Sequence, residues 1–172
     1  MIKERLQKAI NDQITAEMWS SQLYLQMSYF LKLQGWDGYA RWLREHSGEE
    51  REHAVRMADY LCDRGGFVKL QMIDVVPEGW GSIQEIFGHA LSHEKHVSKM
   101  INKVVTLARE EEDYATENFF RTFVDEQVEE EESAREMITT FEAVEGNKYG
   151  MYMIDKELAT RVYNVPSPLA AE

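Results

Sequence analysis

The chain has 172 residues, of which 44% are hydrophobic, and this suits one folded domain with a sizeable core rather than a disordered segment. The formal net charge of −12 opposes nucleic-acid binding, which needs basic patches, and favours cations as partners. A single cysteine excludes an intramolecular disulfide. Because no apolar run approaches the length of a signal-peptide core or a membrane span, we expect a cytoplasmic protein with no membrane partner.

Four long stretches show apolar residues at three- to five-residue steps, the pattern of amphipathic helices. We predict helices over residues 3–34, 37–64, 82–109 and 114–144. Gly35, Gly65-Gly66 and Gly146 stand where three of them end. Ser82 with Glu85 three residues later has the form of a capping box at the start of the third helix. A short fifth helix is expected over residues 148–162.

The segment 65–81 lacks a helical stripe and contains Pro77, so we expect a long loop whose apolar residues pack on the surface of the helices. Such a loop can stretch to roughly 55 Å, whereas a helix of 27 residues is about 40 Å long. The loop can therefore return the chain to the opposite end. The predicted fold is all-α: a single domain over 1–172, with a four-helix bundle over about 3–144 made of two antiparallel hairpins joined by one long crossover.

The sequence Glu50-Arg-Glu-His53 places a carboxylate and an imidazole one helical turn apart, on one face of the second helix. Alone, this pattern is common by chance. However, polar residues also lie near the middle of the other three helices, so a bundle would gather them at one height. The resulting layer contains Glu17, Glu50, His53, Glu94, Gln127 and Glu130.

Several carboxylates in one dry layer repel one another unless a cation neutralises them. A pair of divalent metal ions would do so, with Glu50 placed to bridge the two. Ligation by many oxygens and one imidazole suits iron or manganese and, less selectively, zinc. This combination is typical of carboxylate-bridged di-iron bundles.

These residues make the chain similar to the bacterial non-haem ferritins, which are di-iron four-helix bundles of the ferritin-like family, over essentially its whole length. The resemblance implies that Glu17, Glu50 and His53 bind a first iron. It implies that Glu94 and Glu130 bind a second, with Glu50 shared and Gln127 beside them. Tyr24 matches the tyrosine next to the centre, where it would donate a hydrogen bond or an electron; without the resemblance it would be an ordinary core aromatic.

The same resemblance implies ferroxidase activity, the oxidation of Fe(II) by dioxygen or hydrogen peroxide. The ferric product would be stored as an oxide mineral inside a hollow homo-oligomer of 24 subunits. Two related groups fit less well. Bacterioferritins carry a second Glu-x-x-His where this chain reads Gln127-Val-Glu-Glu130, and a haem-binding methionine where it has Arg51, so we expect no haem. Miniature ferritins lack the fifth helix and build their site between subunits.

Further acids flank the expected centre, at Glu49, Glu126 and Glu129. The resemblance implies a third iron site on the cavity side, formed by these residues. The alternative is a solvated acidic face, which is what most runs of glutamate are.

Two other groups of polar residues admit simpler interpretations. One stripe of the third helix contains His89, His93 and His96. If Glu94 points into the bundle, we expect these histidines to face solvent or a subunit contact. We expect the same of His46. For Asp113 and Glu117 two interpretations stay open. They either line a cation channel in the shell or place negative charge at a helix N-terminus.

Two rival functions use the same predicted bundle. A di-iron oxidase or peroxidase acting on an organic or peroxide substrate would need a substrate pocket and a partner that delivers electrons. A metal-free helical interaction protein would leave the carboxylates of the middle layer unexplained.

Overall fold

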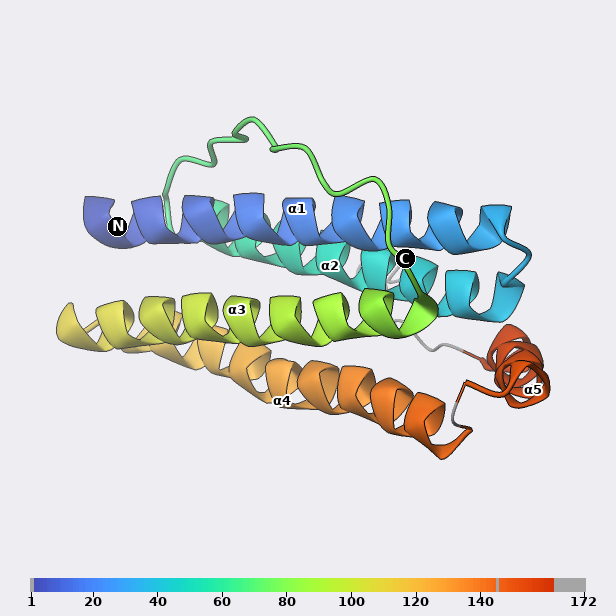
Figure 1. Ribbon diagram of the computed structural model, residues 1–172. Coiled ribbons are helices and arrows are strands. Elements are labelled where there is room, and N and C mark those ends of the chain that lie inside the picture. The colour runs from blue at the N-terminus through green and yellow to red at the C-terminus, as the bar shows by residue number, and fades with distance from the viewer. Residues whose placement is uncertain (1, 145, 163–172) are drawn as a thin grey trace.

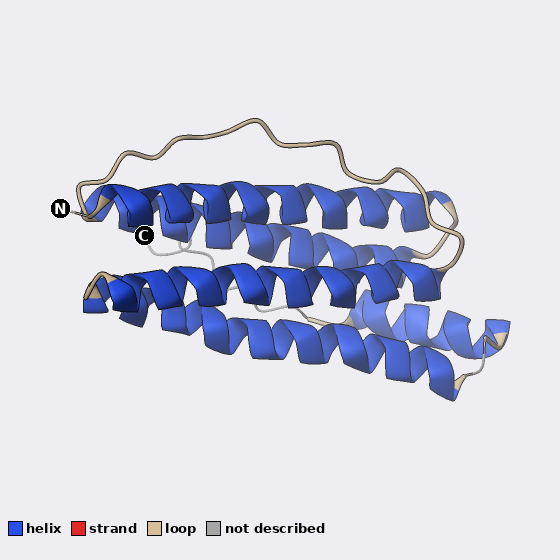
Figure 2. Ribbon diagram, turned by 60° about the vertical axis from the view of Figure 1, so that its left-hand side comes forward, coloured by secondary structure: helices blue, strands red, loops and turns tan. Residues whose placement is uncertain are grey.

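The computed structural model describes residues 2–144 and 146–162. Four long helices lie side by side (Figure 1): α1 (Glu4–Leu33), α2 (Asp37–Asp63), α3 (Ile83–Glu110) and α4 (Tyr114–Ala143). The short α5 (Lys148–Thr160) lies across one end of the bundle and ends two residues before the predicted limit. Figure 2 shows that the rest of the described chain is loop and turn. The predicted all-helical bundle with a crossover and a fifth helix is confirmed.

The predicted helix ends are explained by local chemistry. Gly35 and Gly65 follow α1 and α2 with φ of 85° and 69°, a left-handed conformation that glycine adopts without steric cost. At the start of α3, the Ser82 hydroxyl accepts a hydrogen bond from the Glu85 backbone N–H at 3.1 Å. The Glu85 carboxylate in turn accepts one from the Gly81 backbone N–H at 2.7 Å, so the cap is reciprocal.

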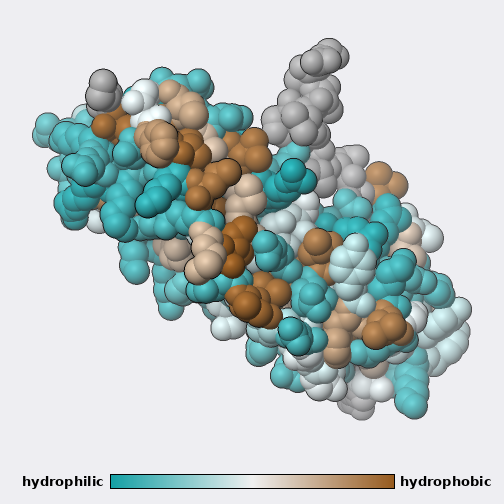
Figure 3. All heavy atoms as spheres, turned by 90° about the horizontal axis from the view of Figure 1, so that it is seen from above, coloured by the Kyte–Doolittle hydropathy of each residue, from teal (hydrophilic) through white to brown (hydrophobic). Residues whose placement is uncertain are grey.

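The crossover loop between α2 and α3 runs along the outside of α1 (Figure 1). Side chains of α1 hold it there: the Asn11 amide group donates to the Phe67 carbonyl oxygen at 3.0 Å and accepts from the Lys69 backbone N–H at 2.7 Å. Figure 3 shows brown apolar patches among polar atoms on this side of the molecule. The loop contributes large exposed apolar side chains to the surface, namely Phe67, Leu70, Met72 and Val75.

The docking of α5 depends on one buried carboxylate. Asp155 is 1% exposed, and its Oδ1 accepts hydrogen bonds from the backbone N–H groups of Gly38 and Tyr39, at 2.8 and 3.2 Å. It thereby satisfies N–H groups in the first turn of α2, where the N-cap residue Trp36 makes no side-chain cap bond. A Cβ on Gly38 would lie 1.7 Å from the Asp155 carbonyl oxygen, so only glycine allows this contact.

The apolar core is divided into two clusters, one toward each end of the bundle. One contains Leu6, Ile10 and Ile14 of α1 with the later turns of α3, and the other contains Leu23, Met27 and Leu31 with the early turns of α3. The predicted polar layer lies between these clusters. The fold thus places polar side chains at mid-height, with apolar side chains sealing them from both ends.

Candidate metal centre

The first half of the centre is formed by α1 and α2. Glu17 and Glu50 are 0% and 1% exposed, and His53 is 9% exposed. One ligand atom from each of the three lies within 4.8 Å of the others. The His53 Nδ1 is 3.7 Å from Glu50 Oε2. The structure therefore brings together the three residues that the sequence predicted for a first metal ion.

One oxygen of each of these two buried carboxylates lacks a hydrogen-bond partner among the described residues. Glu17 Oε2 and Glu50 Oε2 are buried and accept no hydrogen bond from any part of the chain that the structure describes. Burial, with repulsion between the two groups, raises the pKa of Glu17 well above its usual range. Burial and the charge of Glu94 do the same to the pKa of Glu50. A divalent cation between them would supply the missing partner, so the residues fit a metal ion.

The second half of the centre contains Glu94 of α3, which is 1% exposed. The Tyr24 hydroxyl donates a hydrogen bond to Glu94 Oε1, and Gln127 Nε2 donates to Glu94 Oε2 at 2.9 Å. Burial nevertheless raises the pKa of Glu94 to about 7. Tyr24, which is completely buried, is thus a hydrogen-bonding neighbour of the centre, and Gln127 acts on Glu94 as a donor.

Glu130 of α4 lies beside His46, a residue expected from the sequence to face solvent or a subunit contact. His46 is buried, stacks on Trp42 with ring centroids 3.5 Å apart, and places Nε2 3.3 Å from Glu130 Oε2. Burial alone would lower the pKa of His46, but the hydrogen bond and charge of Glu130 outweigh it and raise the pKa to about 9. The pKa of Glu130 is lowered in turn, because His46 outweighs the effect of burial.

The expectation that His46 faces solvent or a subunit contact is therefore wrong. Ligand atoms of His46, Glu49 and Glu130 lie within 4.8 Å of one another, which makes them a second group able to hold a metal ion. A signal was present in the sequence. His46 precedes Glu50 by four residues and therefore shares its helical face.

The three acids predicted for a third iron are not brought together. Glu49 lies next to His46, with Oε2 4.0 Å from Nδ1. Glu126 instead contacts two cationic or basic side chains, Arg56 at 2.9 Å and His53 Nε2 at 3.4 Å. Glu129 is exposed on α4. Glu126 is thus paired with Arg56 and is not a member of the group formed by His46, Glu49 and Glu130.

The prediction that the histidine stripe of α3 faces solvent or a subunit contact is wrong for His93. His93 is half-buried, and its Nε2 lies 2.7 Å from the Ser20 hydroxyl of α1. It packs against the ring of Trp19, with centroids 5.2 Å apart, and burial lowers its pKa to about 4. His89 is exposed and accepts a hydrogen bond from Trp80 Nε1 at 3.0 Å. The prediction failed for His93 because a bundle helix contacts neighbours on two sides, and this stripe faces α1.

The acids at the start of α4 are neutralised within the subunit. Asp113 accepts two hydrogen bonds from the Arg64 guanidinium, at 2.9 and 3.0 Å, and also caps the helix through the Thr116 backbone N–H. Glu117 accepts from Arg109 at 2.7 Å and from Arg121 at 2.8 Å. The helix-terminus interpretation therefore accounts for Asp113. Both carboxylates therefore form ion pairs with arginine side chains of the same chain.

No helix among the described residues is both long and apolar enough to cross a membrane. A family model for the ferritin-like domain matches residues 7–144. The chain is 47% identical over 161 residues to a bacterial non-heme ferritin from Bacteroides fragilis, covering 94% of this chain and all of the relative. It is 34% identical to a bacterial non-heme ferritin from Escherichia coli, with 93% of this chain and 97% of that one covered.

A solved structure, the open-pore ferritin of the archaeon Archaeoglobus fulgidus, superposes with a TM-score of 0.92 at 38% identity, covering 94% of this chain and all of that one. The match thus extends over the bundle, the crossover and the fifth helix. Together with the buried glutamate and histidine layer, these comparisons assign the family. The chain belongs to the ferritin-like domain family and, within it, to the bacterial non-haem ferritins.

Proposed function

We propose that Glu17, Glu50 and His53 bind one Fe(II) ion and that Glu50, Glu94 and Glu130 bind a second. The protein is an iron-storage ferritin with a ferroxidase centre. The observation that best supports this ligand set is the pair of buried oxygens, Glu17 Oε2 and Glu50 Oε2, which have no hydrogen-bond partner in the described chain. A buried carboxylate oxygen without a hydrogen-bond partner is costly to the fold, and a metal ion would supply the missing partner.

The proposed ligands favour oxidation by their charge. Carboxylates stabilise Fe(III) more than Fe(II), because the charge attraction is larger. Each of two ferrous ions gives up one electron, and the oxidant, dioxygen or hydrogen peroxide, accepts both. The ferric ions then acidify bound water, which releases protons as the hydrated oxide forms. Glu94 is held during this step by Tyr24 and Gln127, whose donated bonds fix both of its oxygens.

We also propose a third iron beside Glu49 and Glu130, with Glu126 and Glu129 as its further ligands once Glu126 leaves Arg56. The contact of Glu49 and Glu130 with the same imidazole supports a common site for these two acids. The placement of Glu126 against Arg56 means that the third site forms only when iron competes successfully with that ion pair.

A homo-oligomeric shell of 24 subunits is proposed as the storage compartment. The exposed apolar side chains of the crossover loop support burial against other copies, because patches of this kind on a soluble protein mark interfaces. A cytoplasmic location is proposed as well, and the free thiol of Cys62 is compatible with a reducing compartment.

One experiment separates storage from the rival functions. Fe(II) is added in air to the purified full-length protein while ferric absorbance is recorded and particles are sized by analytical ultracentrifugation. Retention of many irons per large particle supports storage. Uptake that stops at a pair per subunit would favour a di-iron oxidase, and no uptake would leave only a helical scaffold.

A further inference from the structure

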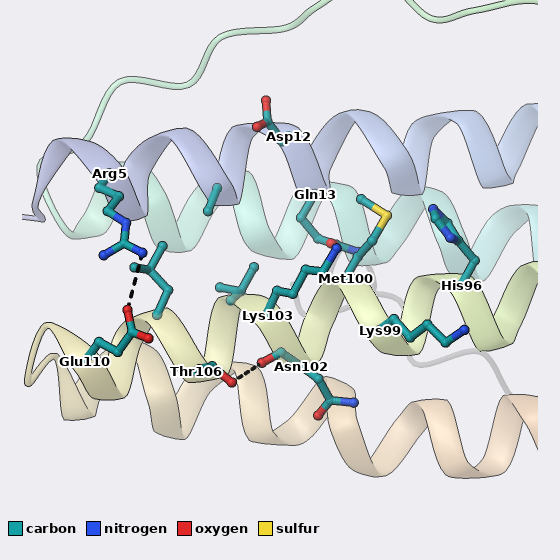
Figure 4. Close-up of a pocket in the computed structure, with 13 residues that line it drawn as sticks. Arg5, Asp12, Gln13, His96, Lys99, Met100, Asn102, Lys103, Thr106 and Glu110 are labelled. Carbon is teal, nitrogen blue, oxygen red and sulfur yellow. Dashed lines mark hydrogen bonds and ion pairs between the residues drawn. The ribbon is translucent and has the colours of Figure 1, made fainter.

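A long open groove lies between α1 and α3 on the outside of the bundle. It has a volume of about 780 Å³, and its lining includes Gln13 of α1 and Met100, Lys103 and Val104 of α3. Figure 4 shows Gln13 extending from α1 toward α3, beside Met100 and Lys103. Although Gln13 lines the groove, it is only 1% exposed. Its side chain therefore forms part of the wall between the groove and the interior.

On its inner side, Gln13 contacts a proposed iron ligand. Gln13 Nε2 donates a hydrogen bond to Glu17 Oε1 at 2.8 Å, and both residues are buried. They are four residues apart on one helix, a spacing at which side chains meet. Glu17 Oε1 is thus occupied, whereas Glu17 Oε2 accepts no hydrogen bond within the described residues.

The chemistry of an amide donor suits this position. A lysine or arginine would neutralise Glu17 and compete with the metal, and an acid would add to the repulsion between Glu17 and Glu50. An amide N–H fixes one oxygen without removing the negative charge. Side chains that hold ligands in this way commonly contribute about 10- to 100-fold to metal affinity.

We propose that Gln13 is a positioning residue, which orients Glu17 so that Oε2 faces the first metal ion. This inference rests on the proposed function, since it takes Glu17 as a ligand. A purely structural role is the alternative. In that case Gln13 would fill space beside the groove, and its loss would lower stability without acting through Glu17.

A double-mutant cycle with Co(II) tests the proposal, because the visible spectrum of Co(II) reports its coordination and no oxidation complicates the readout. Co(II) affinity is measured for the full-length protein, for Gln13→Leu, for Glu17→Ala and for the double variant. We expect Gln13→Leu to weaken the first binding site about 10- to 100-fold. In the Glu17→Ala background the same substitution should change affinity by less than about 2-fold.

A control variant, a replacement variant and the binding stoichiometry make each result decisive. Gln22→Leu, an identical change at an exposed position of α1, should leave Co(II) affinity unchanged. If Gln13→Leu lowers the melting temperature, Gln13→Met, which is unbranched and similar in volume, replaces it. An equal loss in both backgrounds, or no loss at all, would overturn the role of Gln13. If the unmodified protein does not bind two Co(II) ions per subunit, the proposed centre itself is wrong. That outcome can be distinguished from a failure of the role of Gln13, because it appears before any substitution is made.

Discussion

The substitution Glu94→Gln, made in metal-free protein, tests the electrostatics of the buried layer. Burial raises the pKa of Glu94 to about 7 from an ordinary value of 4.5. The pKa is about 2.5 higher in the folded state, and each pKa unit corresponds to about 1.4 kcal/mol, so ionising this group costs the folded state between about 3 and 4 kcal/mol. Because the pKa is higher in the folded state, the stabilising contribution is complete below about pH 4.5 and is lost as the pH rises through about 7.

Glutamine at position 94 stays neutral, so the wild-type protein should lose stability relative to the variant as the pH rises. For a chain of this size, 1 kcal/mol corresponds to about 2–4 °C in melting temperature, and the expected relative change is about 6–12 °C between pH 5 and pH 8. Calorimetry at a fixed protein concentration, with a chelator present, measures it. Glu142→Gln at an exposed site of α4 is the matched control.

A difference in melting temperature between wild type and Glu94→Gln that stays constant across this pH range would contradict a raised pKa for Glu94. A gain in the stability of wild type relative to the variant as the pH rises would contradict it as well. Adding a divalent metal should reverse the trend for wild type, because the metal binds the ionised carboxylate.

Two further substitutions test other contacts. Asp155→Ala should lower the melting temperature more than Glu157→Ala, an exposed control on the same helix, because it leaves buried N–H groups of α2 without an acceptor. Each lost hydrogen bond to a charged group costs about 1.5–3 kcal/mol. Equal effects of the two substitutions would show that α5 docks without this carboxylate. His46→Ala should raise the pKa of Glu130, so the rate of Fe(II) oxidation should fall more at about pH 6 than at about pH 8. A stopped-flow pH profile with His89→Ala as control measures this, and a uniform loss at all pH values would contradict it.

The sequence was sufficient to predict the helices and the height of the polar layer. Apolar periodicity marks the helices, and residues near the middle of four helices of similar length must meet when those helices pack side by side. Glu17, Glu50 and Glu94 were found in this way, and all three are almost completely buried. The resemblance to ferritins added the individual roles, which periodicity alone does not supply.

What the sequence could not predict depends on contacts between helices. The contact between His46 of α2 and Glu130 of α4 depends on how α4 is turned about its own axis relative to α2, and residue spacing within one helix does not determine that. Likewise, the ion pair between Glu126 of α4 and Arg56 of α2 depends on how the two helices pack. The prediction for His93 is wrong because Glu94 and His93 both face neighbouring helices. Glu94 points into the bundle, and the stripe that contains His93 faces α1, where His93 contacts Ser20.

The central claim is that iron is oxidised at a centre whose two metal positions share Glu50. Its most direct test is the initial rate of ferric absorbance after Fe(II) is mixed with oxygenated protein, compared among wild type, Glu50→Ala and the control Glu52→Ala on the same helix. We predict that Glu50→Ala slows the initial rate at least about 10-fold while particle size stays unchanged, and that Glu52→Ala matches wild type. An unchanged initial rate in Glu50→Ala would contradict the account.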